Sequence, residues 1–401
     1  DWEAVAKSAS RIVSADYEAP YLSHAPMEPW NCTVEIDADG VVHIWAPVQT
    51  QDRNRNAAAE AAGVPPEKVR LYTTLLGGGF GRRLGSDGIA AAVVTAKAVK
   101  KPVKFFWRRE DEFGQGWYRP AQAARLEAAL DAEGRVKGLR VRTAGPALSA
   151  SFSPQGLPAG QLDGSSVQTI RESRYKPAAF HVEWVRVDQP VPMAPWRAVG
   201  ATQNGFFLEC FIDEVARAAK RDPYQLRREL LAHDARALNV IDTVAKAAGW
   251  GGPLPEGHAL GMAYVESYGS LCAEVAEVSL REGRPVVHRV VCAIDCGSIV
   301  LPDGVRSQVE GGIVQGLSAV LGEAVNVAAG RAVERNFDAY SMLRIGDAPE
   351  RIETIIIESG ETMGGVGEPP LPPIAPAVVN ALVALTGRPI RELPLSRHRF
   401  A

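Results

Sequence analysis

The sequence predicts an α+β fold, with mixed sheets and helices that flank them. Three observations support this class: hairpin signals recur along the chain, several helical segments stand alone, and no regular βαβ alternation connects them. A regular alternation would instead have indicated one parallel sheet. With 401 residues, the chain is long enough to form two domains or one large intertwined domain.

The first half of the chain alternates strand and helix signals. Two short runs of strand-like residues flank the turn Ala38-Asp39-Gly40 and predict a hairpin. Gly63 closes the first predicted helix, and Pro102 stops the second. In chain order we expect strands over 32–36 and 41–46, a helix over 53–62, a strand over 69–76, a helix over 86–101, a strand over 103–107, a second hairpin over 124–130 and 136–143, and a helix over 202–220.

The best boundary between two regions is the segment from Gly249 to Gly257, which contains Gly-Gly-Pro and Pro-Glu-Gly. We therefore expect a first region over 1–250 and a second over 251–401. The Ser-, Gly- and Pro-rich segment 145–168 predicts a long surface or active-site loop. Beyond the boundary we expect paired strands over 273–280 and 285–294, a helix over 305–321, a strand over 352–358 and a helix over 375–386.

Composition excludes several classes of protein. The apolar fraction of 46% and the charged fraction of 23% are ordinary for a globular protein, and the formal charge of −3 argues against a nucleic-acid surface. No run approaches the roughly 20 apolar residues that a transmembrane helix needs. The start at Asp1-Trp2-Glu3 shows no signal peptide, so we expect a processed or truncated chain and leave its compartment open between periplasm and cytoplasm.

The cysteines and histidines predict no metal site built from protein side chains. The five cysteines are scattered without a Cys-x-x-Cys pair, which argues against an iron–sulfur cluster or zinc ribbon held by this chain alone. Cys292 and Cys296 are expected on one face of a strand, as small core residues. The seven histidines form no His-x-x-x-His pair.

Two glycine-rich loops are the most informative features. The first, over 77–81, reads Gly-Gly-Gly-Phe-Gly and follows a predicted strand, where missing side chains let backbone N–H groups approach an anion. It lacks the Lys-Ser/Thr pair of a P-loop, and Arg82 stands where Gly-x-Gly-x-x-Gly would close. A plain tight turn remains the alternative. The second loop, over 364–370, carries Glu368, and the two loops could meet around one cofactor.

Four motifs occur in a fixed order: Val48-Gln49-Thr50-Gln51, Gly77-Gly78-Gly79-Phe80-Gly81-Arg82-Arg83, Trp196-Arg197-Ala198-Val199-Gly200 and Gly365-Val366-Gly367-Glu368-Pro369-Pro370. With these motifs the chain resembles the large molybdopterin-binding subunits of the xanthine dehydrogenase and aldehyde oxidase family, the molybdenum hydroxylases. It is most similar to the isoquinoline 1-oxidoreductase beta-subunit and aldehyde dehydrogenase type, whose sequence blocks are rearranged. The resemblance spans about Asp16 to Leu395.

The resemblance implies roles for individual residues. Glu368 matches a base toward a molybdenum-bound hydroxyl, Gln51 a glutamine that approaches an oxo ligand, and Arg197 a residue beside the cofactor and substrate channel. The implied cofactor is molybdenum-molybdopterin in its cytosine dinucleotide form, and its dithiolene explains why no protein ligands to the metal are visible. The implied cofactor-binding residues are Gly78, Gly79, Phe80, Gly81, Ala198, Val199, Gly200, Gln308 and Gly367.

Read without the resemblance, the same residues allow plainer interpretations. Glu368 could be a solvated loop glutamate, Gln51 a surface glutamine, and Arg197 a buried ion-pairing arginine. Arg82 and Arg83 could either bind a pyrophosphate or cover the surface.

Some family segments are not found in this chain. The family's Met-Gly-Gln-Gly-type segment and its Ser/Ala-rich segment are missing, and Phe113-Gly114-Gln115-Gly116 stands in the wrong place to replace the former. We therefore expect a second chain, or a removed N-terminal portion, to complete the cofactor site. Leu84 stands where purine-oxidising relatives carry a glutamate, which disfavours a purine substrate.

The resemblance implies an oxidoreductase subunit that hydroxylates an aldehyde or N-heteroaromatic carbon with water as the oxygen source. Its electrons would pass to an iron–sulfur or cytochrome c subunit, because this chain has no suitable cysteine set. The alternatives are a non-catalytic cofactor-binding or assembly module of the same fold, and a cofactor-free fragment produced by proteolysis.

Overall fold

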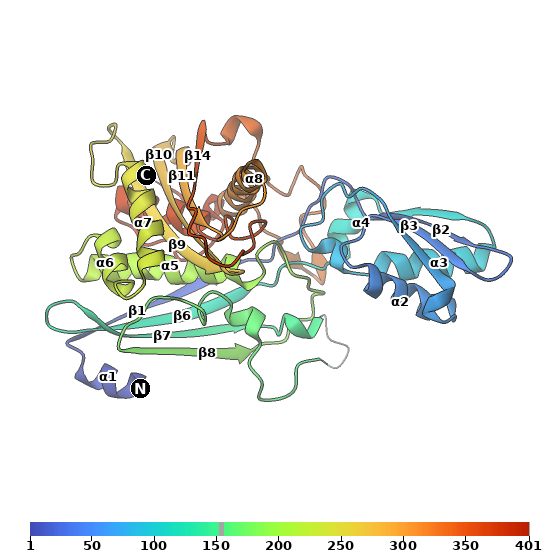
Figure 1. The fold of residues 1–401 in the computed structure, drawn as a ribbon, viewed down its shortest axis with the longest axis horizontal. Helices are drawn as coiled ribbons and strands as arrows, with labels where there is room; N and C mark the ends of the chain where they lie inside the picture. The colour runs from blue at the N-terminus through green and yellow to red at the C-terminus, as the bar shows by residue number, and fades with distance from the viewer. Residues whose placement is uncertain (152–155, 401) are drawn as a thin grey trace.

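The computed structural model describes residues 1–151 and 156–400, and it confirms the α+β class. The described strands form three four-stranded sheets and one small two-stranded sheet. Figure 1 shows a large body from which a smaller unit, residues 30–107, extends to one side. The described helices include none that is both long and apolar enough to cross a membrane.

The small unit is a sheet covered by two helices. Its strand order is β4-β3-β2-β5, with β3 and β4 parallel and the other neighbours antiparallel. Buried side chains such as Val34, Ile44 and Val93 form a core of its own. The elements are β2 (Asn31–Ile36), β3 (Val42–Ala46), β4 (Val69–Thr73), β5 (Val103–Phe106), α2 (Gln51–Ala62) and α3 (Asp87–Val99).

The large body contains two sheets with a helix between them. The first sheet has the order β1-β6-β7-β8 and consists of β1 (Arg11–Ala19), β6 (Gln122–Leu130), β7 (Val136–Gly145) and β8 (Ala179–Arg186). Helix α5 (Gly200–Ala218) packs on β1 and β6 and also contacts β9 of the second sheet (Figure 1). Its residues 200–213 are all buried, as expected of a helix enclosed on several sides.

The second sheet has the order β14-β11-β10-β9 and is also covered by helices. It consists of β9 (His258–Ser267), β10 (Ser270–Arg281), β11 (Arg284–Asp295) and β14 (Arg351–Ile356). Three helices pack against it: α7 (Ala235–Ala248), α8 (Pro302–Leu321) and α9 (Ile374–Thr386). The remaining longer elements are α1 (Trp2–Ser8), α4 (Arg109–Gly114) and α6 (Pro223–Leu230).

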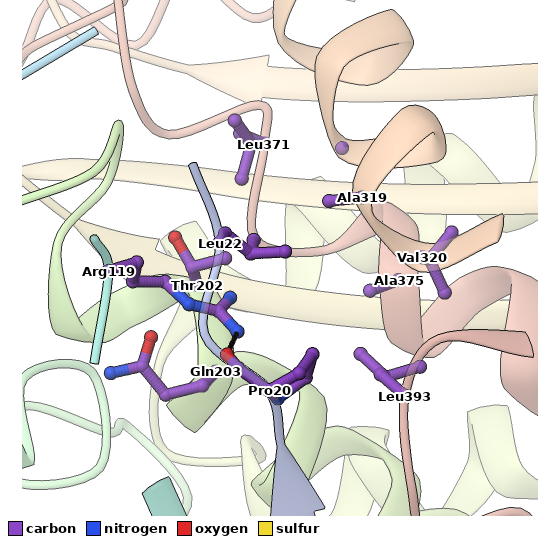
Figure 2. Close-up of a pocket in the computed structure, with 11 residues that line it drawn as sticks. Pro20, Leu22, Arg119, Thr202, Gln203, Ala319, Val320, Leu371, Ala375 and Leu393 are labelled. Carbon is purple, nitrogen blue, oxygen red and sulfur yellow. Dashed lines mark hydrogen bonds between the residues drawn. The ribbon is translucent and has the colours of Figure 1, made fainter. Parts of the chain in front are cut away.

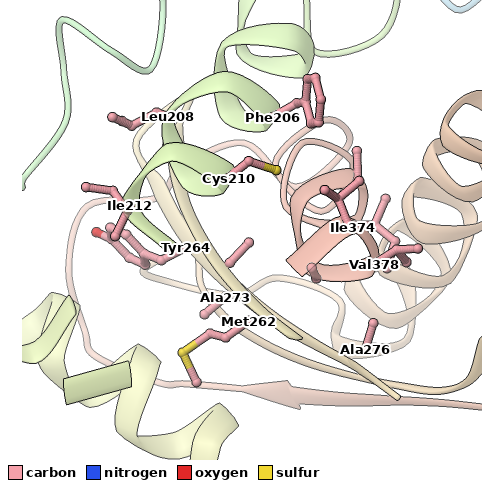
Figure 3. Close-up of a cluster of buried hydrophobic side chains, with 14 of the residues drawn as sticks. Phe206, Leu208, Cys210, Ile212, Met262, Tyr264, Ala273, Ala276, Ile374 and Val378 are labelled. Carbon is pink, nitrogen blue, oxygen red and sulfur yellow. The ribbon is translucent and has the colours of Figure 1, made fainter. Parts of the chain in front are cut away.

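One hydrophobic core runs through the large body on both sides of residue 250. Figure 3 shows Phe206 and Cys210 of α5, Met262 of β9, and Ile374 and Val378 of α9 among the side chains of this core. The predicted boundary at 249–257 falls on the connection between α7 and β9. Because the core crosses that connection, the division into regions 1–250 and 251–401 stays a prediction.

The structure departs from the sequence-based elements in identifiable places. The strand expected over 69–76 ends at Thr73, and the segment 145–168 contains two short 3-10 turns instead of open loop alone; its residues 152–155 lie outside the described range. Cys292 and Cys296 are buried in the main core, as predicted. The helices and strands that the sequence did not reveal are α1, β1, α4, β8, α6, α7, β9 and the short strands β12 (Val327–Ala328) and β13 (Arg331–Ala332).

Candidate active site

The first glycine-rich loop makes a tight turn after β4. Gly78 and Gly81 have φ angles of 95° and 106°, in the region that side chains disfavour. A Cβ atom on Gly81 would lie 1.7 Å from the carbonyl oxygen of Pro195. Glycine at this position therefore lets the backbone of the loop touch the segment that precedes Arg197.

A glutamine side chain holds this loop from one side. The Oε1 atom of Gln49 accepts hydrogen bonds from the amides of Gly81 (3.1 Å) and Arg83 (3.2 Å). A Cβ on Gly79 would lie 2.5 Å from the same oxygen, so a larger residue there would displace the side chain of Gln49. Gln51, which the resemblance placed beside the metal, is exposed at the start of α2 and lines a shallow surface pocket with residues of β4. Its assigned role stays a prediction.

A comparison of two alanine variants separates the roles of Gln49 and Gln51. We expect Gln49→Ala to leave the buried amides of Gly81 and Arg83 without an acceptor and to cost about 1–3 kcal/mol of stability. Gln51→Ala removes no hydrogen bond that the described residues show and should change stability by less than about 0.5 kcal/mol. Thermal unfolding and molybdenum content of both variants check this. A larger loss in Gln51→Ala than in Gln49→Ala would contradict the geometry.

Arg82 and Arg83 follow the glycine loop directly and anchor its end in the protein interior. Both side chains are buried, at 2% and 0% exposure, so they do not cover the surface. Arg82 donates to both carboxylate oxygens of Asp87 (3.0 and 2.9 Å), and Arg83 donates to the carbonyls of Glu28 and Pro29. These contacts hold both side chains inside the protein, although Nε of Arg82 and Nε and Nη1 of Arg83 have no hydrogen-bond partner among the described residues.

The segment from Pro195 to Gly200 forms the second wall of the site. Ala198 and Val199 have positive φ angles of 72° and 51°, which are uncommon for side chains and unfavourable for a β-branched residue. The segment leads into α5, and a Cβ on Gly200 would lie 1.8 Å from the carbonyl oxygen of Ser165. Such a conformation turns the amide of Ala198 toward the loop that carries Glu368.

Glu368 is half-buried, and one of its two carboxylate oxygens accepts hydrogen bonds. The amide of Ala198 donates to its Oε1 atom at 2.9 Å, and the hydroxyl of Tyr268 donates to the same atom at 3.3 Å. Among the described residues, none donates to Oε2. The loop itself is fixed by two hydrogen bonds, from the amide of Gly364 to the carbonyl of Cys296 (2.9 Å) and from the amide of Gly365 to that of Tyr268 (2.8 Å).

Arg197 connects the glycine loop to the Glu368 loop. Its amide donates to the carbonyl of Phe80 (3.0 Å), and its Nε donates to the carbonyl of Gly367 (2.6 Å). The guanidinium also donates to the Oε1 atoms of Gln308 and Gln315 on α8, both at 3.1 Å. Burial lowers the pKa of Arg197, while the nearby carboxylate of Glu368 opposes that shift. The arginine is therefore partly buried, and among the described residues its guanidinium contacts carbonyl and amide oxygens and forms no ion pair.

Two residues of this cluster were not found from the sequence. Gln315 lies on α8, where the helical pattern gives no sign that its side chain reaches Arg197. Tyr268 lies in the turn between β9 and β10 with a positive φ of 52°, and only the contact across 100 residues reveals it. Burial, followed by the charge of Glu368, raises the pKa of Tyr268, so its hydroxyl stays a proton donor in neutral and mildly alkaline solution.

Tyr268 is expected to position Glu368. Tyr268→Phe removes one hydrogen bond to a charged acceptor, which is worth about 1.5–3 kcal/mol and corresponds to roughly a 10- to 150-fold loss of kcat if it acts in the transition state. The amide of Ala198 still holds Oε1 in that variant. Steady-state kinetics checks this, and an unchanged kcat would show that the contact has no part in turnover.

A small cavity lies behind these loops. Its volume of about 20 Å³ suits a single water molecule. Figure 2 shows Thr202 and Gln203 of α5, Leu371 and Arg119 around it. Burial lowers the pKa of Arg119 to about 10. The cavity is too small for an aromatic substrate.

Comparison with known proteins decides what this arrangement belongs to. A family model described as molybdopterin cofactor-binding domain matches residues 1–231, and a second model of the same description matches residues 212–349. This chain belongs to the molybdopterin cofactor-binding family. The predicted family is therefore confirmed, and the two matches overlap within α5 and α6.

Individual relatives agree with this family. The beta subunit of isoquinoline 1-oxidoreductase from Brevundimonas diminuta is 34% identical over 391 residues, which are 96% of this chain and 50% of that relative. A membrane-bound aldehyde dehydrogenase from Gluconacetobacter polyoxogenes, whose name specifies pyrroloquinoline quinone, is 30% identical over 97% of this chain and 54% of that relative. The chain thus spans about half the length of these curated relatives.

The fold is also shared with a solved oxidoreductase structure. The structure of quinoline 2-oxidoreductase from Pseudomonas putida 86 superposes with a TM-score of 0.82, covering 98% of this chain and 76% of that one at 15% identity. At that identity the likeness establishes the fold, and the residues of the site must be judged from this chain's own geometry.

The residues present suit a molybdopterin cofactor. In the described part of the chain, the amides of Gly79 and Phe80 donate no hydrogen bond. Unpaired backbone N–H groups at a turn are suited to phosphate or oxo groups. Of the predicted cofactor-binding residues, Phe80, Gly367 and Gln308 meet at Arg197, while Gly78, Gly79, Gly81, Ala198, Val199 and Gly200 form the adjoining turns.

Proposed function

We propose that this chain is part of a molybdenum-dependent oxidoreductase subunit that hydroxylates an aldehyde or an N-heteroaromatic carbon, with water as the oxygen source. The proposal depends on one observation: Glu368 is held at Oε1 by the amide of Ala198, beside a glycine turn with unpaired amides, in a chain of the molybdopterin cofactor-binding family. The names of the relatives supply the two substrate classes.

Residues of this chain take up the proton and position the carboxylate that accepts it. Glu368 keeps Oε1 bound and Oε2 unbound among the described residues, so Oε2 is the atom that takes a proton from the attacking water-derived oxygen. When bound, the cofactor supplies the two-electron redox chemistry. Arg197 keeps the Glu368 loop against the glycine turn, and Tyr268 restrains the carboxylate. The amides of Gly79 and Phe80 would hold the cofactor through its oxygen atoms.

The cytosine dinucleotide form of the cofactor and the partners are further parts of the proposal. The subunit name of the Brevundimonas diminuta relative supports an assembly with other chains. We propose a second chain, or a further portion of this protein, that supplies the remaining cofactor contacts, together with an iron–sulfur or cytochrome c subunit that takes the electrons. Nucleotide analysis of acid-released cofactor checks the first part, since it should yield CMP.

Turnover with labelled water tests the function. The assembled protein should oxidise an aldehyde or a quinoline-type heterocycle and incorporate ¹⁸O from water into the product, with molybdenum present at about one atom per chain. Xanthine is the matched negative control, because Leu84 disfavours purines. Oxidation that depends on pyrroloquinoline quinone, or product oxygen that derives from O₂, would contradict the proposal.

A further inference from the structure

A second group of ligand-type side chains lies on strands β10 and β11, outside the site described above. Cys272 and Glu274 belong to β10 and Cys292 to β11, and the strand register places Glu274 directly opposite Cys292. Because alternate residues of a strand share a face, the three side chains point to the same side. Their donor atoms all lie within 4.8 Å of one another, and the two Sγ atoms are 3.5 Å apart.

Glu274 is the unusual member of this group. Its side chain is fully buried, at 0% exposure, and within the described residues neither carboxylate oxygen has a hydrogen-bond partner. Burying an ionised carboxylate without a partner is very costly, and even a neutral polar group left unpaired costs about 1–3 kcal/mol. Its polar neighbours are thiols, which are weak donors.

Three other buried carboxylates of the large body form ion pairs with arginines. Glu209 and Asp213 both pair with Arg227, at 2.9 and 2.6 Å, and Asp295 pairs with Arg236 at 2.8 Å. In the part of the chain that the structure describes, no Arg, Lys or His pairs with Glu274. The sequence thus supplies a cation for each of those carboxylates but not for the one that faces two cysteines.

We propose that Cys272, Glu274 and Cys292 form a binding site for one thiophilic d¹⁰ metal ion, with Zn²⁺ the ion that fits best. Two sulfurs and one carboxylate are ligands that Zn²⁺ takes in proteins. Bonds of about 2.0–2.3 Å in a tetrahedral site separate ligand atoms by roughly 3.3–3.8 Å, and the observed Sγ to Sγ distance of 3.5 Å lies in that interval. Binding releases the thiol protons to solvent.

The site would stabilise the strands that hold the Glu368 loop. The hydroxyl of Ser270, at the start of β10, donates to the carbonyl of Gly365 at 2.6 Å. The carbonyl of Cys296, just after β11, accepts from the amide of Gly364 at 2.9 Å. An ion that ties β10 to β11 between these points therefore fixes the base of the loop, and its role is structural.

Metal analysis of the purified chain tests this. The wild-type protein should retain about one Zn²⁺ after dialysis against EDTA, counted separately from molybdenum, so the result does not depend on the proposed function. Cys292→Ala and Glu274→Gln should each lower the retained zinc at least tenfold. Cys210→Ala is the matched control, because Cys210 is buried in the same core on α5 and should leave zinc unchanged.

A second measurement keeps the proposal testable if a variant fails to fold. Wild-type protein exchanged into Cd²⁺ should show sulfur-to-cadmium charge-transfer absorption, and X-ray absorption should find two sulfur neighbours. Folded wild-type protein that retains neither Zn²⁺ nor Cd²⁺ would overturn the proposal. So would a bound ion without sulfur ligands, or zinc retention that is equal in Glu274→Gln, Cys292→Ala and the wild type.

Discussion

Glu368→Gln is expected to lower kcat by about 10²–10⁴-fold while leaving molybdenum content unchanged. Loss of a general base costs a factor of this size. The amide of glutamine has nearly the same shape, and its oxygen can still accept from the amide of Ala198, so the loop should keep its place. Steady-state kinetics with the preferred substrate and metal analysis of the same preparation measure both quantities.

The control for this prediction lies just before the loop. Glu361 is exposed, its carbonyl accepts from the amide and hydroxyl of Ser298, its amide donates to the hydroxyl of Ser359, and its side chain makes no hydrogen bond among the described residues. Glu361→Gln should therefore retain wild-type kcat. If Glu368→Gln also turned over normally, with full molybdenum content, the chain would be a cofactor-binding or assembly module and not the part that carries the base.

Gly81→Ala is expected to cost about 2–5 kcal/mol of stability and to release the glycine loop from Arg197. The left-handed backbone costs about 1–2 kcal/mol for a residue with a Cβ, and overpacking costs about 1–3 kcal/mol more. The added Cβ would overlap the carbonyl of Pro195, which also binds Nε2 of His24 at 2.8 Å. Burial lowers the pKa of His24 to about 3, so the imidazole is neutral near pH 7. Molybdenum content should fall together with the melting temperature.

Gly40→Ala separates the effect of backbone conformation from that of contact. Gly40 has a φ of 72°, and a Cβ there would meet nothing within 4 Å. This variant should lose only about 1–2 kcal/mol and keep its molybdenum. Equal losses in Gly81→Ala and Gly40→Ala would show that the contact with Pro195 does not matter.

The two glycine-rich loops could be predicted from the sequence because glycine and proline indicate turns and loops locally, whatever the rest of the fold. The glycine-rich runs at 77–81 and 364–367 could be assigned to loops, and the hairpin at β2 and β3 could be placed from its turn residues. Strand β9 could not be predicted, because it is buried along most of its length and its sequence therefore lacks the alternation of apolar and polar residues.

Some residues of the candidate site could likewise be predicted from the sequence, and others could not. Glu368 and Arg197 were selected from short motifs, and the structure brings them to one place through Gly367 and Ala198. Gln49 stands two residues from Gln51, and only the strand and helix geometry shows which of them reaches the glycine loop. Tyr268 makes its contact across 100 residues, which no local pattern encodes.

Anomalous diffraction at the molybdenum edge, from crystals of the assembled protein, tests the central claim most directly. The account predicts one molybdenum peak in the space bounded by the amide of Phe80, the turn at Ala198 and the carboxylate of Glu368, with Oε2 as the nearest carboxylate oxygen. A molybdenum peak elsewhere in the chain, with Glu368 far from it, would contradict the account.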